Sequence, residues 1–323
     1  MNRFAQFALI LLAGGMLASP FVAVAQPYPS RPVRLVVPFP PGGPTDIVGR
    51  TIAQQLQERW GQPVVVENRP GAGAIIGMNA VAKAAPDGYT LLLGSNSLAL
   101  NKSLYSKLPF ELERDFAPVI LITRIPNVLV VHPSVPSNTV AELIALAKAK
   151  PGQLNFASVG TGTGPHLFAE LFISQTGIQL VHVPYKGTAP AVNDLLAGQV
   201  QMLFDSLATA LPNIRAGKLR ALGVTSATRA SAARELPTLA EAGVGGYEAT
   251  GWFAIAVTGG TPADIVARLN ADLGRALETT AVRDRLERLG GVAPGRRTAS
   301  GHGSDLGIAF NPGRSAGQAL LFA

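Results

Sequence analysis

The loop at residues 38–46, with the sequence PFPPGGPTD, carries the most distinctive chemistry of this chain. It joins an apolar run at residues 33–37 to a segment at 46–60 with helical periodicity. A strand that breaks into a glycine and proline loop and then opens a helix leaves backbone N–H groups unpaired at the positive end of the helix dipole. Such a loop is suited to bind an anion, for example a carboxylate or a phosphate. Because the loop contains no Lys, Arg, His or Cys, we expect it to bind through its backbone rather than react through a side chain.

The same arrangement recurs at residues 156–166, with the sequence FASVGTGTGPH. Here Ser158, Thr161 and Thr163 add hydroxyl donors to the exposed N–H groups, and Pro165 suits the first turn of a helix. Two such loops that face each other across a cleft would clamp an anion between them. For either loop alone, a glycine turn that merely ends a strand is an equally good interpretation.

Catalytic, cofactor and metal sites are poorly supported by the sequence. The glycines within 71–73 and 160–164 resemble fragments of a dinucleotide fingerprint, but their spacing is imperfect and no acidic residue clearly ends the next strand. Ser158 is not in a nucleophile elbow, because Phe156 stands where that motif needs a glycine. The four histidines show no metal-ligand spacing. We therefore expect neither a catalytic set nor a cofactor nor a metal.

Several other polar residues lie near the ends of predicted strands. Asp205 follows an apolar run and either holds a loop or binds a ligand amine. Tyr185 and Lys186 lie just past a strand end, where Lys186 is either solvated or near the cleft mouth. His166 is expected at a helix start near the cleft, and His182 in the core or in the cleft wall.

The elements that must position these residues alternate between short β-rich runs and helical segments. This alternation predicts α/β layers over a mainly parallel sheet, and two such lobes joined without a linker favour a ligand cleft between them. A capping box at 139–142 begins one helix, and TPAD at 261–264 begins another. Strands are expected at 33–38, 64–67, 90–94, 117–123, 127–131, 154–158, 180–183, 202–204, 219–224 and 252–257. Helices are expected at 46–60, 165–176 and 189–197. Three more are expected with one end defined: one ends at residue 85, one begins at 140 and one begins at 261.

The N-terminus predicts export. A basic start, an apolar run at residues 4–17 and the AVA sequence at 23–25 are typical of a secretory signal peptide cleaved after Ala25. A membrane anchor is the alternative, but Gly14 and Gly15 interrupt the run, which is short for a bilayer. Cleavage leaves about 298 residues, enough for two domains or one large domain.

The composition excludes several functional classes. The chain has no cysteine, so neither disulfides nor thiolate chemistry contribute. Its formal charge is +7, but Lys and Arg are scattered and no basic stripe with interleaved aromatics occurs, so nucleic-acid binding is not expected. A modest positive charge suits an anionic small ligand.

Several motifs together resemble one known family. PFPPGGPTDIVGR, ENRPGAGAIIG, PDGYTLLLGS, FASVGTGTGPHLFAE and HVPYKGTAPAVNDLLAGQV resemble the Bug family, the periplasmic solute receptors of tripartite tricarboxylate transporters. The likeness runs in order from about residue 33 to residue 289. It implies a two-lobed periplasmic-binding-protein fold of type II with its ligand cleft between the lobes. Such a receptor closes over a small carboxylate and delivers it to a membrane permease or a sensor, and it is not an enzyme.

The resemblance also implies the residues of the site and the lobe boundaries. Backbone amides and ordered waters of the two glycine loops would hold the carboxylate. Lobe 1 would comprise residues 26–123 and 226–323, with 252–257 returning the chain to it, and lobe 2 would comprise 124–225. We expect a monomer. The implied site residues are Phe39, Gly42, Gly43, Thr45, Asp46, Ser95, Ser158, Gly160, Thr161, Thr163 and His166, with Tyr185, Lys186 and Asp205 as weaker candidates.

The segment at 293–323 departs from the family pattern. Family members usually continue with a long amphipathic helix that packs on the first lobe, whereas this segment is rich in Gly, Ser and Arg and lacks helical periodicity. We interpret it as a frameshifted or otherwise altered terminus, which would uncover part of the first lobe's apolar face.

Two functions remain open from the sequence. The first is a periplasmic receptor for a small carboxylate, whose identity is open among dicarboxylates, amino acids, aromatic acids and nicotinate-like acids. The alternative is an exported enzyme, a hydrolase or a dinucleotide-dependent enzyme, that uses the same cleft.

Overall fold

The computed structural model describes residues 28–291. The chain divides into residues 1–30 and residues 31–323, and every element below belongs to the second unit. The predicted signal peptide at 1–25 and the atypical segment at 293–323 lie outside the described residues. None of the helices in the described range is long and apolar enough to cross a membrane.

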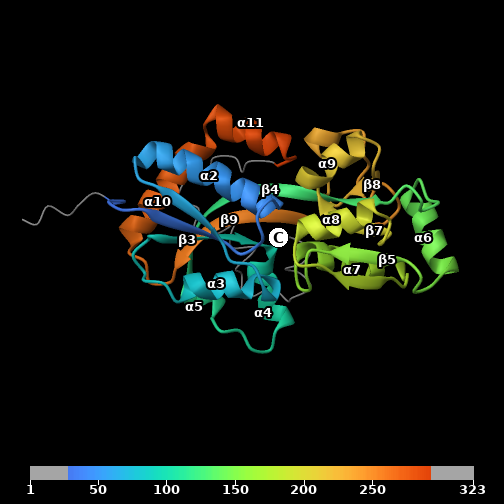
Figure 1. Ribbon diagram of the computed structural model, residues 1–323, viewed down its shortest axis with the longest axis horizontal. Coiled ribbons are helices and arrows are strands. Elements are labelled where there is room, and N and C mark those ends of the chain that lie inside the picture. The colour runs from blue at the N-terminus through green and yellow to red at the C-terminus, as the bar shows by residue number, and fades with distance from the viewer. Residues whose placement is uncertain (1–27, 292–323) are drawn as a thin grey trace, which may run out of the picture. The chain divides into compact units, whose positions relative to one another are not determined.

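The described residues form one nine-stranded sheet in the order β2-β1-β3-β9-β4-β7-β5-β6, with β8 paired to β4 (Figure 1). We call β1–β3 and the helices on them the first lobe, and β5–β8 and the helices on them the second lobe. The strands are β1 Val33–Val37, β2 Val64–Asn68, β3 Thr90–Ser95, β4 Phe116–Val131, β5 Asn155–Ser158, β6 Val181–Pro184, β7 Met202–Ser206, β8 Arg220–Val224 and β9 Thr250–Thr258.

The sheet is mixed rather than mainly parallel. Strand β1 runs parallel to β2 and β3, and β5 runs parallel to β6 and β7, as the alternating pattern predicted. Between these two sets, β4 and β9 run antiparallel to their neighbours. The difference arises because β9 enters the sheet after the second-lobe strands and pairs back with β3.

Strand β4 connects the lobes. The predicted strands at 117–123 and 127–131 are one continuous strand, which pairs with β9 up to Pro126 and with β7 and β8 from there on. Pro126 lacks an N–H and so weakens the ladder locally without ending the strand. The lobe boundaries at 123 and 225 stay a prediction.

Helices cover the sheet in both lobes (Figure 1). The periodicity of α2 predicts Val48, Ile52, Leu56 and Trp60 on one face; the first three are buried, and Trp60 is half-buried. The helix ends at Gly61, which has a φ of 62° in the left-handed region. The helices are α2 Pro44–Trp60, α3 Ile75–Ala82, α4 Asn96–Leu104, α5 Leu112–Asp115, α6 Val140–Ala149, α7 Gly164–Thr176, α8 Thr188–Leu196, α9 Leu207–Arg215, α10 Ala263–Leu277 and α11 Thr280–Arg288, and the 3-10 turns are Ala72–Ala74 and Ser231–Ala233.

The core of the second lobe follows the alternation of its strands. Leu129 and Phe204 belong to one buried cluster, whereas their neighbours Val128 and Leu203 belong to another. Successive side chains of a strand point to opposite faces, so β4 and β7 separate two apolar layers. The strand ends are thereby fixed between two packed faces.

Candidate functional site

A pocket lies where the loops of the two lobes meet. The space within it is about 670 Å³, open solvent at its mouth included. Residues of both lobes line it: Phe39, Pro40, Gly43, Pro44, Thr45, Ser95, Asn96, Ser97, Ile125, Asn127, Val159, Thr163, Gly164, Pro165, Phe168, Gly187, Thr188, Asp205, Ser206, Gly251 and Phe253.

Five of the described helices begin at this pocket. The residues that precede helices α2, α4, α7, α8 and α9 are all lining residues, namely Gly43, Ser95, Thr163, Gly187 and Ser206. None of these five helix starts has a hydrogen bond from a capping side chain. The side chains of Thr139 and Thr279 cap α6 and α11, whose starts do not line the pocket, whereas α3, α5 and α10 also start away from it and have no capping side chain. The first-turn N–H groups at the pocket therefore lack the partner that a capping side chain would supply.

The electrostatics of the pocket come from the backbone. Each helix start carries roughly half a positive elementary charge from the helix dipole. No Lys, Arg or His is among the described residues that line the pocket, and Asp205 is the single ionisable side chain among them. The arrangement thus favours an anion without offering a cationic side chain, as the loop at 38–46 predicted.

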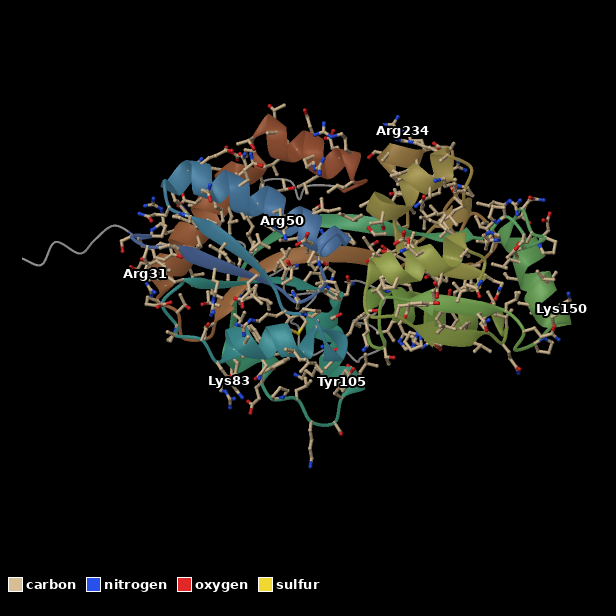
Figure 2. The ribbon with its side chains drawn as sticks, viewed as in Figure 1. Arg31, Arg50, Lys83, Tyr105, Lys150 and Arg234 are labelled. Carbon is tan, nitrogen blue, oxygen red and sulfur yellow. The ribbon has the colours of Figure 1, made fainter. Side chains whose placement is uncertain are left out.

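Asp46 holds the first glycine loop in place. Its Oδ2 accepts hydrogen bonds from the Gly42 N–H at 3.0 Å and from Arg50 Nε at 2.9 Å, and its Oδ1 accepts one from Asn68 Nδ2 at 2.9 Å. Asn68 also donates to the carbonyl oxygen of Phe39 at 3.0 Å. Burial raises the pKa of Asp46, but the hydrogen bonds from Arg50, Gly42 and Asn68 outweigh this and hold the pKa below its usual value. Asp46 is not a lining residue, and Arg50 extends from α2 beside it (Figure 2).

The second glycine loop is also held by its own side chains. Ser158 Oγ accepts the Gly160 N–H at 3.2 Å and lies 2.7 Å from His182 Nε2. Nδ1 of His166 accepts the Gly162 N–H at 3.3 Å, and the rings of His166 and His182 stack with centroids 4.2 Å apart. Burial lowers the pKa of His166. Burial also lowers the pKa of His182, to about 4, and the neighbouring His166 adds to this second shift. Both rings are therefore neutral at physiological pH and act as supports for the loop.

Asp205 lies at the end of β7, directly before the start of α9. Its Oδ1 accepts a hydrogen bond from Thr209 Oγ1 at 2.7 Å, and its Oδ2 is buried without a hydrogen-bond partner among the described residues. Burial raises the pKa of Asp205 to about 7, although hydrogen bonds from Thr209 and from the Ser206 backbone oppose the shift. Two hydroxyls of other lining residues, Ser97 Oγ and Ser206 Oγ, are likewise buried without a partner.

The structure divides the predicted site residues into two sets. Six of them line the pocket: Phe39, Gly43, Thr45, Ser95, Thr163 and Asp205. The others lie behind it or outside it: Gly42, Asp46, Ser158, Gly160, Thr161, His166, Tyr185 and Lys186. Within this second set, Tyr185 donates its hydroxyl to Asp194 at 2.7 Å, and Lys186 is exposed. A contact between ligand and any of these residues stays a prediction.

Sequence reasoning missed the lining residues of α4, α8 and α9. Asn96 and Ser97 open α4, whose start buries polar residues and so shows no apolar periodicity. Asn96 accepts the Trp252 N–H at 3.1 Å and donates to the carbonyl of Thr250 at 3.1 Å, which ties α4 to β9. Ser206 opens α9, a helix with Pro212 in its interior, and prolines argue against helices. At both places the signal available in the sequence was a serine at the end of a predicted strand, Ser95 before α4 and Ser206 before α9.

The two lobes touch on both sides of the pocket. A Cβ built on Gly187 would lie 2.8 Å from Pro40 Cγ, and one on Gly43 would lie 3.3 Å from Thr188 Oγ1. On the other side, a Cβ on Gly162 would lie 3.2 Å from Leu104 Cδ1 and 3.5 Å from the hydroxyl of Tyr105, at the end of α4 (Figure 2). These glycines allow a close approach that a larger residue would prevent.

Comparison with known proteins identifies the family. Residues 48–297 match the model of the tripartite tricarboxylate transporter family receptor. The chain is 42% identical over 284 residues to the protein BugT of Bordetella pertussis, covering 87% of this chain and 86% of BugT.

Solved structures agree with this assignment. Rpa4515 of R. palustris, solved with adipate, superposes with a TM-score of 0.85 at 37% identity and covers 92% of this chain and 99% of that one. MatC of Rhodopseudomonas palustris, solved with bound malate, superposes with a TM-score of 0.77 at 36% identity. This superposition covers 83% of this chain and 91% of the MatC chain. The predicted two-lobed fold and the prediction of a receptor rather than an enzyme are confirmed. The chain belongs to the tripartite tricarboxylate transporter receptor family, whose members are periplasmic solute-binding proteins and include the Bug proteins.

Proposed function

We propose that this receptor captures a small dicarboxylate in the periplasm and delivers it to the membrane component of a tripartite transporter or to a sensor. The observation that carries the proposal is the convergence of five uncapped helix starts on a pocket whose described lining contains no cationic side chain. Backbone N–H groups at helix starts are a well-suited site for a carboxylate. The ligands of two relatives, adipate and malate, have the same chemistry.

Capture proceeds by closure of the lobes. Thr45 and Ser95 lie at the starts of α2 and α4 in the first lobe, and Thr163 and Ser206 lie at the starts of α7 and α9 in the second. A carboxylate that docks on one lobe gains the N–H groups of the other only when the lobes close. The ligand favours the closed state by this difference in contacts.

Specificity for the length of the ligand's carbon chain comes from the rest of the pocket. Apolar side chains, among them Phe39, Ile125, Phe168 and Phe253, lie between the helix starts. They favour a carbon chain, while the separate helix starts of the two lobes favour an acidic group at each end of it. Export after cleavage at Ala25, lobe boundaries at 123 and 225, and a monomeric receptor belong to the same proposal.

A ligand panel tests the proposal. The mature protein is heated with malate, glutarate, adipate, a monocarboxylate and a tricarboxylate, and each acid is matched by its uncharged amide. We expect one or more dicarboxylates to raise Tm by several degrees and the matching diamide to leave it unchanged, because the amide lacks the charge that the helix starts bind. If no acid raises Tm, or if a diamide raises it as much as its acid, the proposal fails.

A further inference from the structure

Among the described residues that line the pocket, Asp205 is the one with an ionisable side chain. It is 2% exposed, at the end of β7, where Asp205 pairs with Val128 of β4. The Thr209 hydroxyl donates to its Oδ1, and that hydroxyl also donates to the Ser206 carbonyl at 3.0 Å. Its Oδ2 has no hydrogen-bond partner in the part of the chain that the structure describes. A buried oxygen with no partner is costly if it is charged, and it is satisfied if it carries a proton and meets an acceptor.

Within residues 28–291, no charged group compensates for the ionisation of Asp205. The elements packed against β7 are β4, β5, α7, α8 and α9. Their titratable groups are Arg124 on β4, His166 and Glu170 on α7, Asp194 on α8 and Arg215 on α9, and β5 has none. None of these groups is a lining residue. His166 lies 3.6 Å from Glu170, Asp194 accepts from Tyr185, and Arg215 donates to the Ala232 carbonyl.

A bound carboxylate ligand makes the ionised form of Asp205 less favourable than the protonated form. Two ionised carboxylates in one small pocket repel each other, and the usual outcome is that one of them takes up a proton. The helix starts favour the ionised form of the ligand. Asp205 is the group buried without a compensating cation, so the proton goes to Asp205. With a proton on Oδ2, Asp205 becomes a donor, and the ligand supplies the acceptor that the protein lacks.

We propose that a carboxylate ligand binds together with one proton, and that the proton resides on Asp205 Oδ2, from which it is donated in a hydrogen bond to the ligand. The inference rests on the proposed function and goes beyond it, because it makes capture dependent on pH and assigns a role to Asp205. The step is a simple protonation: Asp205 takes a proton from solvent and no other bond changes. Since burial raises the pKa of Asp205 to about 7 in the absence of ligand, the uptake is largest in alkaline solution and disappears in acid.

Calorimetry in paired buffers tests the proposal. Adipate is titrated into the mature protein at pH 6.0, 7.0 and 8.0, in two buffers with different enthalpies of ionisation. We expect the apparent binding enthalpy at pH 8.0 to differ between buffers by an amount equal to nearly one proton taken up per ligand, and the difference to fall toward zero at pH 6.0. Above pH 7, Kd should rise by up to tenfold per pH unit, as linkage to a single proton requires.

Two variants isolate Asp205. In Asp205→Asn the amide keeps an oxygen for Thr209 and cannot titrate, so we expect no proton uptake and a Kd that is flat from pH 6 to pH 8. The matched control is Asp194→Asn, which removes a carboxylate outside the pocket and should bind adipate with the proton uptake of the parent protein. Near-ultraviolet circular dichroism of both variants verifies that they are folded.

The possible outcomes separate this inference from the proposed function. Adipate binding with no buffer dependence at pH 8.0, or with the same buffer dependence in Asp205→Asn, overturns the role of Asp205 and leaves the receptor function intact. An amino acid such as aspartate that binds more tightly than malate, glutarate and adipate and without proton uptake also overturns it, because the ionised Asp205 would then bind the ammonium group. Absence of binding by every acid at every pH counts against the proposed function instead.

Discussion

Replacement of Gly187 by Ala should weaken ligand binding by preventing the lobes from closing. Gly187 precedes α8 in the second lobe with φ 124° and ψ 177°, a conformation that is essentially restricted to glycine. A Cβ there would lie 2.8 Å from Pro40 Cγ and 3.3 Å from Pro40 Cδ, whereas carbon atoms in ordinary contact are about 3.5–4.0 Å apart. The loop of Pro40 in the first lobe must therefore retreat by about 1 Å in the closed state.

The expected loss of affinity follows from this clash. Forcing an extra methyl group into a packed contact costs about 1–3 kcal/mol. Since the clash exists only where the lobes meet, the cost falls on the closed state and raises Kd by about 5- to 150-fold. Calorimetric titration with the dicarboxylate that the panel selects measures this increase.

The control for backbone strain is Gly243→Ala. Gly243 also has a positive φ, 105°, but a Cβ there would meet nothing within 4 Å. Both variants should lower the free energy of unfolding by about 1–3 kcal/mol through strain, and only Gly187→Ala should raise Kd. Equal affinities in the two variants would refute the reasoning that Gly187 is needed for closure.

Three further predictions concern stability. Asp46→Asn offers one acceptor oxygen to three donors, so it should lower the free energy of unfolding in urea at pH 7 by about 2–3 kcal/mol. This loss should shrink as the pH falls from 3.8 through the lowered pKa of Asp46, because the unfolded wild-type chain then takes up a proton before the folded protein does. As a control, replacement of the exposed Asp264 in the first turn of α10 by Asn should cost less than about 0.5 kcal/mol. Asp205→Asn without ligand should be more stable than the wild type by up to about 4 kcal/mol at pH 8. Burial raises the pKa of Asp205 from 3.8 to about 7, so the free energy of unfolding of the wild type falls as the pH rises between those values. If the variant and the wild type are equally stable at pH 8 as well as at pH 4, this prediction is wrong. Ala72→Gly should raise the free energy of unfolding by about 0.5–1 kcal/mol and Tm slightly, because Ala72 is exposed and has a φ of 47° in the left-handed region. A fall in Tm would show that this loop is not strained.

The sequence predicted the strand-to-helix turns well because their signals are local. The apolar run at 33–37 and the glycines and prolines after it require a strand, a turn and a helix in that order, and β1 and α2 have nearly the predicted bounds. The direction of β4 and β9 was not predictable in the same way, because it depends on pairing between residues more than a hundred positions apart. The α4 start was missed since its buried Asn96 and Asn101 make tertiary hydrogen bonds, to the carbonyl oxygens of Thr250 and Gly73, and do not follow an apolar periodicity.

The same distinction applies to the site. Sequence motifs identified both glycine loops, but they did not distinguish residues that line the pocket from residues that hold the loops. Asp46, Ser158 and His166 are within these motifs, yet in the structure their side chains accept N–H groups of Gly42, Gly160 and Gly162. Their presence in a motif reflects the shape of the loop as much as contact with a ligand. Thr188 and Ser206 lie outside the two glycine loops and line the pocket nonetheless.

The reliance on helix starts has a consequence for how this receptor should be dissected. Alanine substitution removes a side chain and leaves the amide of the same residue in place, so an alanine scan of Thr45, Ser95, Thr163 and Ser206 would understate the contribution of these positions to binding. Exchange of a single amide for an ester, by semisynthesis at Thr45, removes the N–H itself and keeps the side chain. Among related receptors, the same backbone can retain its affinity for acids while the surrounding side chains change, which allows one scaffold to acquire new ligands without rebuilding its charge recognition.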